Sequence, residues 1–236
     1  MQIVTVLKSG GSYKPDHLAR LYGGCLKWSR GVFDFICLTD FPEKEIREAH
    51  INIRPVPLKN NWPGWWSKLE LFRGDFSEAP RMLYLDLDTV PVGPFRGIWE
   101  CEDPFLALKD FNKGTLATGL MVWNGDYSFL YEAAGGFIEK MGITSENWKK
   151  TWDQRFVAEW LKKKKVPITF VQDKFPNWVV SYKKHCEQGL PEDARIVCFH
   201  GKPRPWEVAK PWIKENWRKQ HVSRFRKSSP RNSSDS

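Results

Sequence analysis

The sequence predicts an α/β fold, with a mostly parallel central sheet flanked by helices in a single domain. Short apolar runs alternate with helical patterns over roughly the first 90 residues, and this order is typical of parallel strands joined by crossover helices. A length of 236 residues is enough for one sizeable core. The apolar run MLYLDLDTVP, residues 82–91, ends in Asp86 and Asp88, and parallel sheets place their sites at the carboxyl ends of strands.

Hydrophobic periodicity defines the elements that precede the aspartate strand. Ile3–Leu7 is predicted to be a buried strand, and residues 16–28 have the apolar spacing of a helix. Phe33–Asp40 is a second strand, and residues 51–58 form a third, whose prolines favour the edge of a sheet. A short helix begins at Ser67 and leads into the aspartate strand.

The second half of the chain continues the mixed pattern. Strands are predicted over 104–110, 119–126, 168–173 and 195–202, and helices over 127–141 and 152–165. The lysines that end the second of these helices suit the negative end of its dipole. A last amphipathic stretch covers 211–220, and the polar residues after it are expected to be disordered.

Positive charge is concentrated at the carboxyl terminus. The chain has a formal charge of +9, and Arg218–Ser236 contains six basic residues and one acid. We therefore predict a domain over 1–217 and a basic, disordered tail over 218–236. A solvated tail is the simpler interpretation, and peripheral contact with an anionic membrane is the functional alternative. Nucleic acid is the less favoured partner.

Cysteine usage and hydropathy predict a cytoplasmic protein. The five cysteines show no CxxC spacing, and most lie in apolar runs, as buried thiols in a reducing compartment do. The N-terminus has the pattern of a strand rather than of a signal peptide. No stretch approaches the roughly 20 apolar residues that span a bilayer, so any membrane association is expected to be peripheral.

Asp86 and Asp88 are the first candidates for chemistry. Side chains alternate along a strand, so both carboxylates are expected on one face and Leu87 on the other. Like charges held this close need a neutralising partner, and hard carboxylate oxygens suit Mn²⁺ or Mg²⁺. The simpler alternative is that DLD ends a strand and begins a turn, because this short pattern is common.

The segment LYLDLDTVPVGPFRGIW, residues 83–99, resembles the metal-binding segment of retaining glycosyltransferases with the GT-A fold. The resemblance is closest to glycosyltransferase family 8, the group that contains glycogenin and the lipopolysaccharide galactosyltransferases. Three further segments resemble the same family in the same order: WWSKLELF, WDQRFVAEW and VCFHGKPRPW. The resemblance covers the chain from about Ile3 to Trp206, and it implies a Rossmann-like sheet of the GT-A type.

By this resemblance three side chains hold a metal ion. Asp86 and Asp88 are its carboxylate ligands, and His200, at the end of the run RIVCFH, is the third. An imidazole beside two carboxylates favours Mn²⁺, with Mg²⁺ as the alternative. The simpler alternative is that His200 is an ordinary hydrogen-bonded histidine at the end of a strand.

The resemblance also implies the remaining site residues. Asp153 and Gln154 begin a helix and are the catalytic candidates, beside the transferred sugar. Lys68, Gly201 and Lys202 are expected to bind the donor together with the two aspartates, since positive charge is needed where the diphosphate leaves. On residue type alone, Asp153 could equally be a helix N-terminal acid, and the two lysines could be surface residues.

Three segments depart from the family pattern. Residues 117–119 are Ala-Thr-Gly where the family usually has Asn-Ala-Gly or Asn-Ser-Gly, so an expected asparagine that contacts the sugar is missing. His200 and Gly201 adjoin, whereas the family often separates them. The first loop, LKSGGSY, lacks the family's usual Thr or Asp, which weakens the identification of the base as uracil.

The predicted reaction transfers a sugar from a nucleotide-sugar donor to an acceptor hydroxyl with retention of configuration. The donor is expected to be a UDP-sugar, and the acceptor a saccharide, a glycolipid or a protein. One alternative is a sugar-nucleotide or nucleic-acid binding protein without turnover. Another is a haloacid-dehalogenase-like phosphatase, whose DxDxT motif DLDT also fits. The phosphatase is disfavoured because its motif normally follows the first strand, and here 85 residues precede Asp86.

Overall fold

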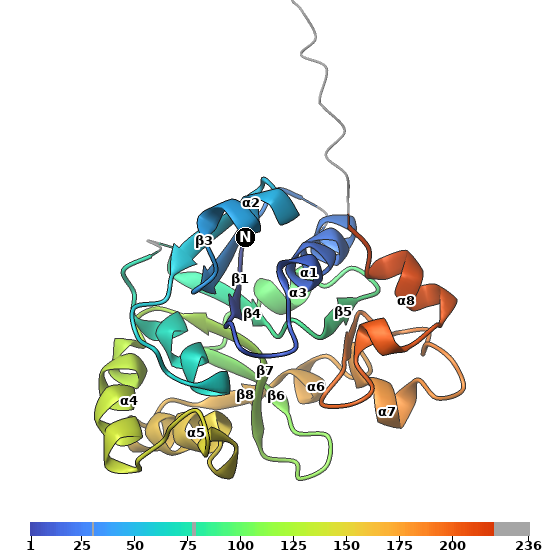
Figure 1. The fold of residues 1–236 in the computed structure, drawn as a ribbon. Coiled ribbons are helices and arrows are strands. Elements are labelled where there is room, and N and C mark those ends of the chain that lie inside the picture. Colours follow the sequence, from blue (N-terminus) through green and yellow to red (C-terminus); the bar gives the residue numbers. More distant parts are fainter. Residues whose placement is uncertain (30, 77–78, 220–236) are drawn as a thin grey trace, which may run out of the picture.

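The computed structural model describes residues 1–29, 31–76 and 79–219, and Figure 1 shows helices surrounding two sheets. The strands of the larger sheet are β1 (Gln2–Leu7), β2 (Asp34–Thr39), β3 (Ile53–Pro57), β4 (Arg81–Leu85), β6 (Phe105–Lys109), β7 (Leu116–Asn124) and β8 (Ile168–Phe170). The smaller sheet contains β5 (Thr89–Pro91), β9 (Val179–Ser181) and β10 (Ile196–Cys198).

The helices vary widely in length. The α-helices are α1 (Pro15–Trp28), α2 (Glu43–Ala49), α3 (Arg96–Trp99), α4 (Ser128–Lys140), α5 (Asp153–Lys163), α6 (Val171–Lys174), α7 (Tyr182–His185) and α8 (Pro211–Asn216). Short 3₁₀ helices are η1 (Gly64–Phe72), η2 (Trp148–Lys150) and η3 (Pro205–Glu207). The longest helices, α1, α4 and α5, coincide with the helices predicted over 16–28, 127–141 and 152–165.

The larger sheet has the strand order β3-β2-β1-β4-β7-β6-β8. Neighbours pair in parallel except where β7 meets β4 and β6, so β7 runs against the other described strands of this sheet. The predicted α/β fold with a mostly parallel sheet is confirmed. The proline-containing β3 lies at an edge, as expected, because proline lacks the N–H group that a central strand donates.

Alternate residues of the central strands belong to two hydrophobic cores. Ile3 and Leu7 of β1 lie in the core that includes Leu18 of α1. Val4, between them, lies in the core that includes the fully buried Trp66 of η1. Consequently α1 and α2 cover one face of the sheet, while α4, α5 and η1 cover the other (Figure 1).

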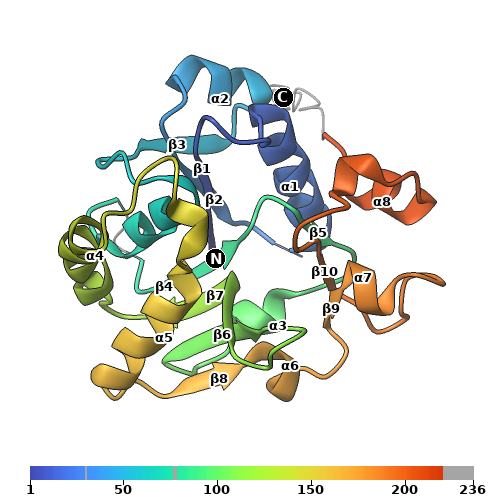
Figure 2. The same ribbon diagram turned by 60° about the horizontal axis from the view of Figure 1, so that its bottom comes forward.

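The smaller sheet adjoins the larger one at the aspartate motif. β10 pairs with β5 in antiparallel fashion and with β9 in parallel fashion, and α8 packs against it through Ile213. Figure 2 places this sheet beside α7 and α8. β4 ends at Leu85 and β5 begins at Thr89, so the chain passes from one sheet to the other across Asp86 and Asp88.

Three element predictions need correction. The strand expected over 195–202 ends at Cys198. The strand expected over 168–173 ends at Phe170, because the amide side chain of Gln172 instead hydrogen-bonds both backbone groups of Lys109, at 2.8 and 2.7 Å. Val171–Lys174 is consequently helical. The helix expected from Ser67 begins at Gly64 and is a 3₁₀ helix. The sequence patterns also did not predict helix α2 or strand β9. β9 has only three residues, too few for a hydrophobic periodicity to be recognised.

All five cysteines are buried and free, which agrees with their apolar sequence environments. Burial raises the pKa of the Cys186 thiol to about 11. Burial also raises the pKa of the Cys25, Cys37 and Cys198 thiols far above the ordinary value. These thiols are therefore protonated at neutral pH, and they act as small apolar side chains.

The ends of the predicted domain and tail can be compared only in part with the structure. The tail was predicted over 218–236, and residues 220–236 lie outside the described residues. None of the helices in the described part of the chain is long and apolar enough to cross a membrane.

Candidate active site

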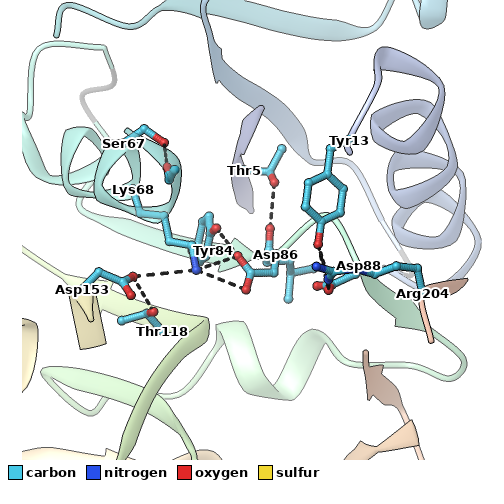
Figure 3. A network of polar contacts seen from close by, with 12 residues as sticks. Thr5, Tyr13, Ser67, Lys68, Tyr84, Asp86, Asp88, Thr118, Asp153 and Arg204 are labelled. Carbon is cyan, nitrogen blue, oxygen red and sulfur yellow. Dashed lines mark hydrogen bonds and ion pairs between the residues drawn. The ribbon is translucent and has the colours of Figure 1, made fainter. Parts of the chain in front are cut away.

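Asp86 lies where β4 ends, and two side chains hold its carboxylate. The Lys68 Nζ atom is 2.9 Å from Oδ1, and the Tyr84 hydroxyl donates a 2.5 Å hydrogen bond to the same oxygen. Tyr84 precedes Asp86 by two residues, so the two side chains project from the same face of the strand. η1 supplies Lys68 from the neighbouring layer, and Figure 3 shows the three side chains converging.

Lys68 links Asp86 to a second, fully enclosed carboxylate. Its Nζ atom is 3.8 Å from Oδ2 of Asp153, the first residue of α5. The Thr118 hydroxyl donates a 2.7 Å hydrogen bond to that oxygen. Burial raises the pKa of Asp153, and the charge of Lys68 and the bond from Thr118 oppose this rise. Burial opposes the charged form of Lys68, but the carboxylates of Asp86 and Asp153 outweigh it and raise the pKa of Lys68.

Asp88 has its own pair of partners. The Tyr13 hydroxyl donates a 2.8 Å hydrogen bond to Oδ2, and the Arg204 guanidinium forms an ion pair with the same oxygen. Burial, reinforced by the charge of Asp86, raises the pKa of Asp88 to about 7, although Arg204 opposes the rise. Each aspartate of the motif is thus paired with a basic side chain from a distant segment.

Backbone hydrogen bonds from both sheets hold the motif in place. The Asp86 N–H group donates to the Gly119 carbonyl at 3.0 Å, and the Phe199 N–H group donates to the Asp88 carbonyl at 3.1 Å. The Thr5 hydroxyl binds the Leu85 carbonyl at 2.8 Å. Because β7 runs antiparallel to β4, its first residues reach the carboxyl edge of the sheet, where they face the motif.

The structure does not bring His200 together with the two aspartates as a third metal ligand. Its Nε2 atom is hydrogen-bonded to the Ser181 hydroxyl at 2.7 Å, and its ring stacks on Phe111 with a centroid separation of 5.5 Å. Within residues 1–29, 31–76 and 79–219 no group of three or more His, Cys, Asp or Glu side chains is arranged to hold a metal ion. The physical reason is that Phe199, which follows β10, donates its backbone N–H group to the Asp88 carbonyl. The side chain of the next residue, His200, is bound to Ser181 of β9.

The remaining expected site residues differ in how far they are buried. Gln154 is half-buried beside Asp153 at the start of α5. Gly201 and Lys202 are exposed in the loop after β10, and Gly201 adopts a φ of +83°, which favours glycine. The structure thus unites Lys68 with the carboxylates, and leaves Lys202 on the surface of the adjoining loop.

Four further residues of the network were absent from the sequence prediction. These are Tyr13, Tyr84, Thr118 and Arg204. Strand alternation could have identified Tyr84, which stands two positions before Asp86. Thr118 lies in the Ala-Thr-Gly segment that departs from the family pattern, and here its hydroxyl is what binds Asp153. Tyr13 and Arg204 lie in the quoted segments LKSGGSY and VCFHGKPRPW, but nothing in the sequence showed that the fold brings these two loops together.

The aspartate pair fits a divalent cation on the chemistry of its donors. The network contains three carboxylates, Asp86, Asp88 and Asp153, and two basic side chains, Lys68 and Arg204. When all three carboxylates are ionised, negative charge exceeds positive charge by one. Hard carboxylate oxygens of this kind suit Mg²⁺ or Mn²⁺, which complete their coordination with water and substrate oxygens.

A flat aromatic surface adjoins the buried carboxylates. Trp152 directly precedes Asp153 and is 50% exposed, and its ring is stacked on Trp65 at 4.9 Å with an interplanar angle of 9°. Trp148 meets Trp65 edge-on at 4.3 Å, and the Trp65 indole N–H group donates to the Thr151 carbonyl at 3.0 Å. One face of the Trp152 ring is therefore packed against Trp65, while half of the side chain remains exposed to solvent.

Solved structures share this fold. The galactosyltransferase LgtC, determined in complex with donor and acceptor sugar analogues, matches 87% of this chain over 89% of its own, with a TM-score of 0.63 and 13% identity. The glycosyltransferase GlyE of Streptococcus pneumoniae TIGR4 matches 92% of this chain over 59% of its own, with a TM-score of 0.64 and 14% identity. The bifunctional glycosyltransferase WbbM matches 93% over 51%, with a TM-score of 0.55 and 12% identity.

These likenesses define the fold of the chain. No protein-family model matches the sequence, and no curated protein sequence matches it. The shared architecture is the GT-A fold of glycosyltransferases, which confirms the fold implied by the sequence resemblance. At 12–14% identity these likenesses show the fold alone, so the function is inferred from the side chains of this molecule.

Proposed function

We propose that this protein is a glycosyltransferase that moves a sugar from a nucleotide-sugar donor, a UDP-sugar, to an acceptor hydroxyl. The observation that carries the proposal is the buried network in which Lys68 joins Asp86 and Asp153 at the carboxyl edge of β4. Burying charged groups is costly, so a network of this density at a sheet edge favours a binding or catalytic role. LgtC, which has the same fold, was crystallised with donor and acceptor sugar analogues.

In this proposal Asp86 and Asp88 hold a divalent cation, Mn²⁺ or Mg²⁺. When bound, such an ion acts as a Lewis acid towards the departing diphosphate. Lys68 keeps its proton and supplies fixed positive charge beside Asp86, where a donor phosphate would accumulate negative charge. Lys202 lies on the exposed loop after β10 and adds charge at the rim of the same site.

Asp153 and Gln154 are the proposed contacts to the transferred sugar. Asp153 is held by Thr118 and Lys68, so its carboxylate is fixed before any sugar arrives, and such preorganisation favours the transition state. Gln154 stands beside it and is a weak nucleophile. Retention is therefore proposed to proceed by attack of the acceptor on the face that the diphosphate leaves, with the leaving phosphate oxygen taking the acceptor proton.

The donor proposal predicts a metal-dependent thermal shift. A ligand that binds only the folded state raises its stability by RT ln(1 + [L]/Kd). A UDP-sugar with Mn²⁺ is expected to raise the melting temperature, whereas the nucleotide sugar with EDTA is not. The screen should include GDP-sugars and ADP-sugars, because the first loop lacks the usual uracil-binding pattern. Stabilisation that ignores the metal would contradict the proposal.

The acceptor is proposed to stack on the Trp152 ring, which is 50% exposed and which the flexible Lys113 side chain approaches to 5.9 Å from the ring centre. Its indole is firmly backed by Trp65 and directly precedes Asp153, and flat aromatic faces suit the apolar faces of sugar rings. The Trp152→Ala variant is expected to raise the acceptor KM about fivefold and leave the UDP-sugar Kd unchanged, since one such contact contributes roughly 1 kcal/mol. Met141→Ala, which removes a side chain that is also 50% exposed, is the matched control. An unchanged acceptor KM in Trp152→Ala would contradict this placement.

A further inference from the structure

Side chains from opposite ends of the chain close off Asp88, and we propose that this contact is a lock that a divalent cation has to open. Tyr13 donates a 2.8 Å hydrogen bond to Oδ2 of Asp88, and Arg204 forms an ion pair with the same oxygen. Arg204 also donates a 2.5 Å hydrogen bond to the Tyr13 hydroxyl. Each of the three side chains thus contacts the other two, and Figure 3 shows them converging.

The guanidinium and a metal ion compete for the same carboxylate, because Arg204 already occupies Oδ2 of Asp88. Arg204 already supplies positive charge to Asp88, and both side chains are largely covered, with exposed fractions of 23% and 9%. Asp86 is more open, with 30% of its side chain exposed. A cation that approaches the pair can reach Asp86 from solvent, but at Oδ2 of Asp88 it has to displace Arg204, and at Oδ1 it still meets the repulsion of the adjacent guanidinium. Arg204 is therefore a positioning residue that sets how tightly the pair binds a cation.

The loops that carry the lock are anchored independently of Asp88. The loop before Tyr13 is held at its start, where Lys8 Nζ is 2.7 Å from the Asp40 carboxylate. Tyr13 also meets the ring of Trp206 edge-on at 5.7 Å, and the Arg204 guanidinium lies 5.1 Å from the centre of the Tyr13 ring. Release of Asp88 consequently requires a side-chain movement of Arg204, while the two loops stay joined through their aromatic contacts.

This inference rests on the proposed cation site, and its test reads cation binding without any sugar. Mn²⁺ binding to the full chain is measured by electron paramagnetic resonance of the free ion. Arg204→Gln is expected to bind Mn²⁺ about tenfold more tightly than the wild type, equivalent to about 1.4 kcal/mol. Tyr13→Phe removes one donor to Asp88 without changing charge, and a gain of about threefold is expected, the size of one hydrogen bond.

Matched variants separate the lock from general electrostatics. Lys183→Gln removes the same unit charge from an exposed side chain on the nearby helix α7, and it is expected to change the Mn²⁺ affinity less than twofold. Arg204→Lys keeps the charge but loses the planar fork that spans Tyr13 and Asp88, so its affinity should lie between those of the wild type and Arg204→Gln. Adding Asp88→Asn should abolish the gain of Arg204→Gln.

The possible results of these measurements separate a failure of the lock from a failure of the proposed cation site. If Arg204→Gln and Tyr13→Phe bind Mn²⁺ no more tightly than the wild type, or if Lys183→Gln gains as much as Arg204→Gln, the lock is wrong and the proposed function stands. If the wild type and every variant fail to bind Mn²⁺, the cation and the lock are both wrong, and the nucleotide-sugar screen alone decides the function. Thermal melts verify folding, and Tyr13→Phe and Arg204→Lys suffice if Arg204→Gln does not fold.

Discussion

Asp88→Asn is expected to reduce sugar transfer from a UDP-sugar by at least about a thousandfold. The proposed cation would lose one of its two carboxylate ligands, and Arg204 would lose the partner of its ion pair. Metal ions contribute several kcal/mol to the stabilisation of leaving-group charge, and a thousandfold loss corresponds to roughly 4 kcal/mol in the barrier. Turnover is measured as released UDP and as transferred sugar at saturating Mn²⁺.

The control for this variant removes a carboxylate elsewhere. Asp173→Asn breaks a surface ion pair with Lys109, whose Nζ atom is 2.9 Å from Oδ1, and it is expected to leave turnover near the wild-type value. Thermal melts of both variants show whether the folded fraction accounts for any loss. Retention of more than a tenth of wild-type turnover in folded Asp88→Asn would rule out a role for Asp88 in holding the ion.

Glu70→Ala is expected to produce the largest loss of stability. Glu70 is fully buried, and its carboxylate accepts hydrogen bonds of 2.7 Å from the backbone N–H groups of Lys59 and Asn60. It also pairs at 2.7 Å with Arg73, whose side chain is only 4% exposed. Removing Glu70 leaves two backbone N–H groups without their acceptor and leaves the buried Arg73 with only the more exposed Asp75, 2.8 Å from its Nε atom, as a partner. Breaking a buried pair in this way typically costs about 3–5 kcal/mol.

Chemical denaturation tests this prediction and separates it from a surface effect. For a domain of this size the melting temperature should fall by on the order of 10 °C. Glu159→Ala removes a glutamate that pairs with an exposed arginine one helical turn away, and surface pairs of this kind contribute little, so its stability should be close to wild type. A loss for Glu70→Ala no greater than that for Glu159→Ala would contradict the interpretation. Because η1 carries both Glu70 and Lys68, a reduced melting temperature should come with weaker donor binding.

The sequence predicted the fold well where local patterns were strong. Alternating strands and helices predicted the parallel half of the sheet, and the prolines of β3 predicted its place at an edge. The direction of β7 was not predictable, because an apolar run of nine residues reads the same in either direction. That direction matters for the site, since it brings Thr118 beside Asp153 at the carboxyl edge of β4.

The candidate site was also predictable only in part. Asp86, Asp153 and Lys68 were identified from a family resemblance, and the structure brings them together. The pairing of Asp88 with Tyr13 and Arg204 joins residues 75 and 116 positions apart in the sequence. No periodicity or spacing carries such information, because long-range contacts form only when the sheets assemble. The contacts of His200 with Ser181 and Phe111 were not predictable for a similar reason, because these residues come from other segments.

The burial of all five thiols gives this chain a built-in reporter of its own unfolding. A maleimide or iodoacetamide reagent modifies thiolates, and a buried, protonated thiol is exposed to it only when the surrounding structure opens. Pulsed alkylation followed by intact-mass measurement would therefore count open molecules directly, without any optical probe. A nucleotide sugar that binds the native state should slow the appearance of modified chains, so the same five atoms can rank candidate donors in a crude mixture.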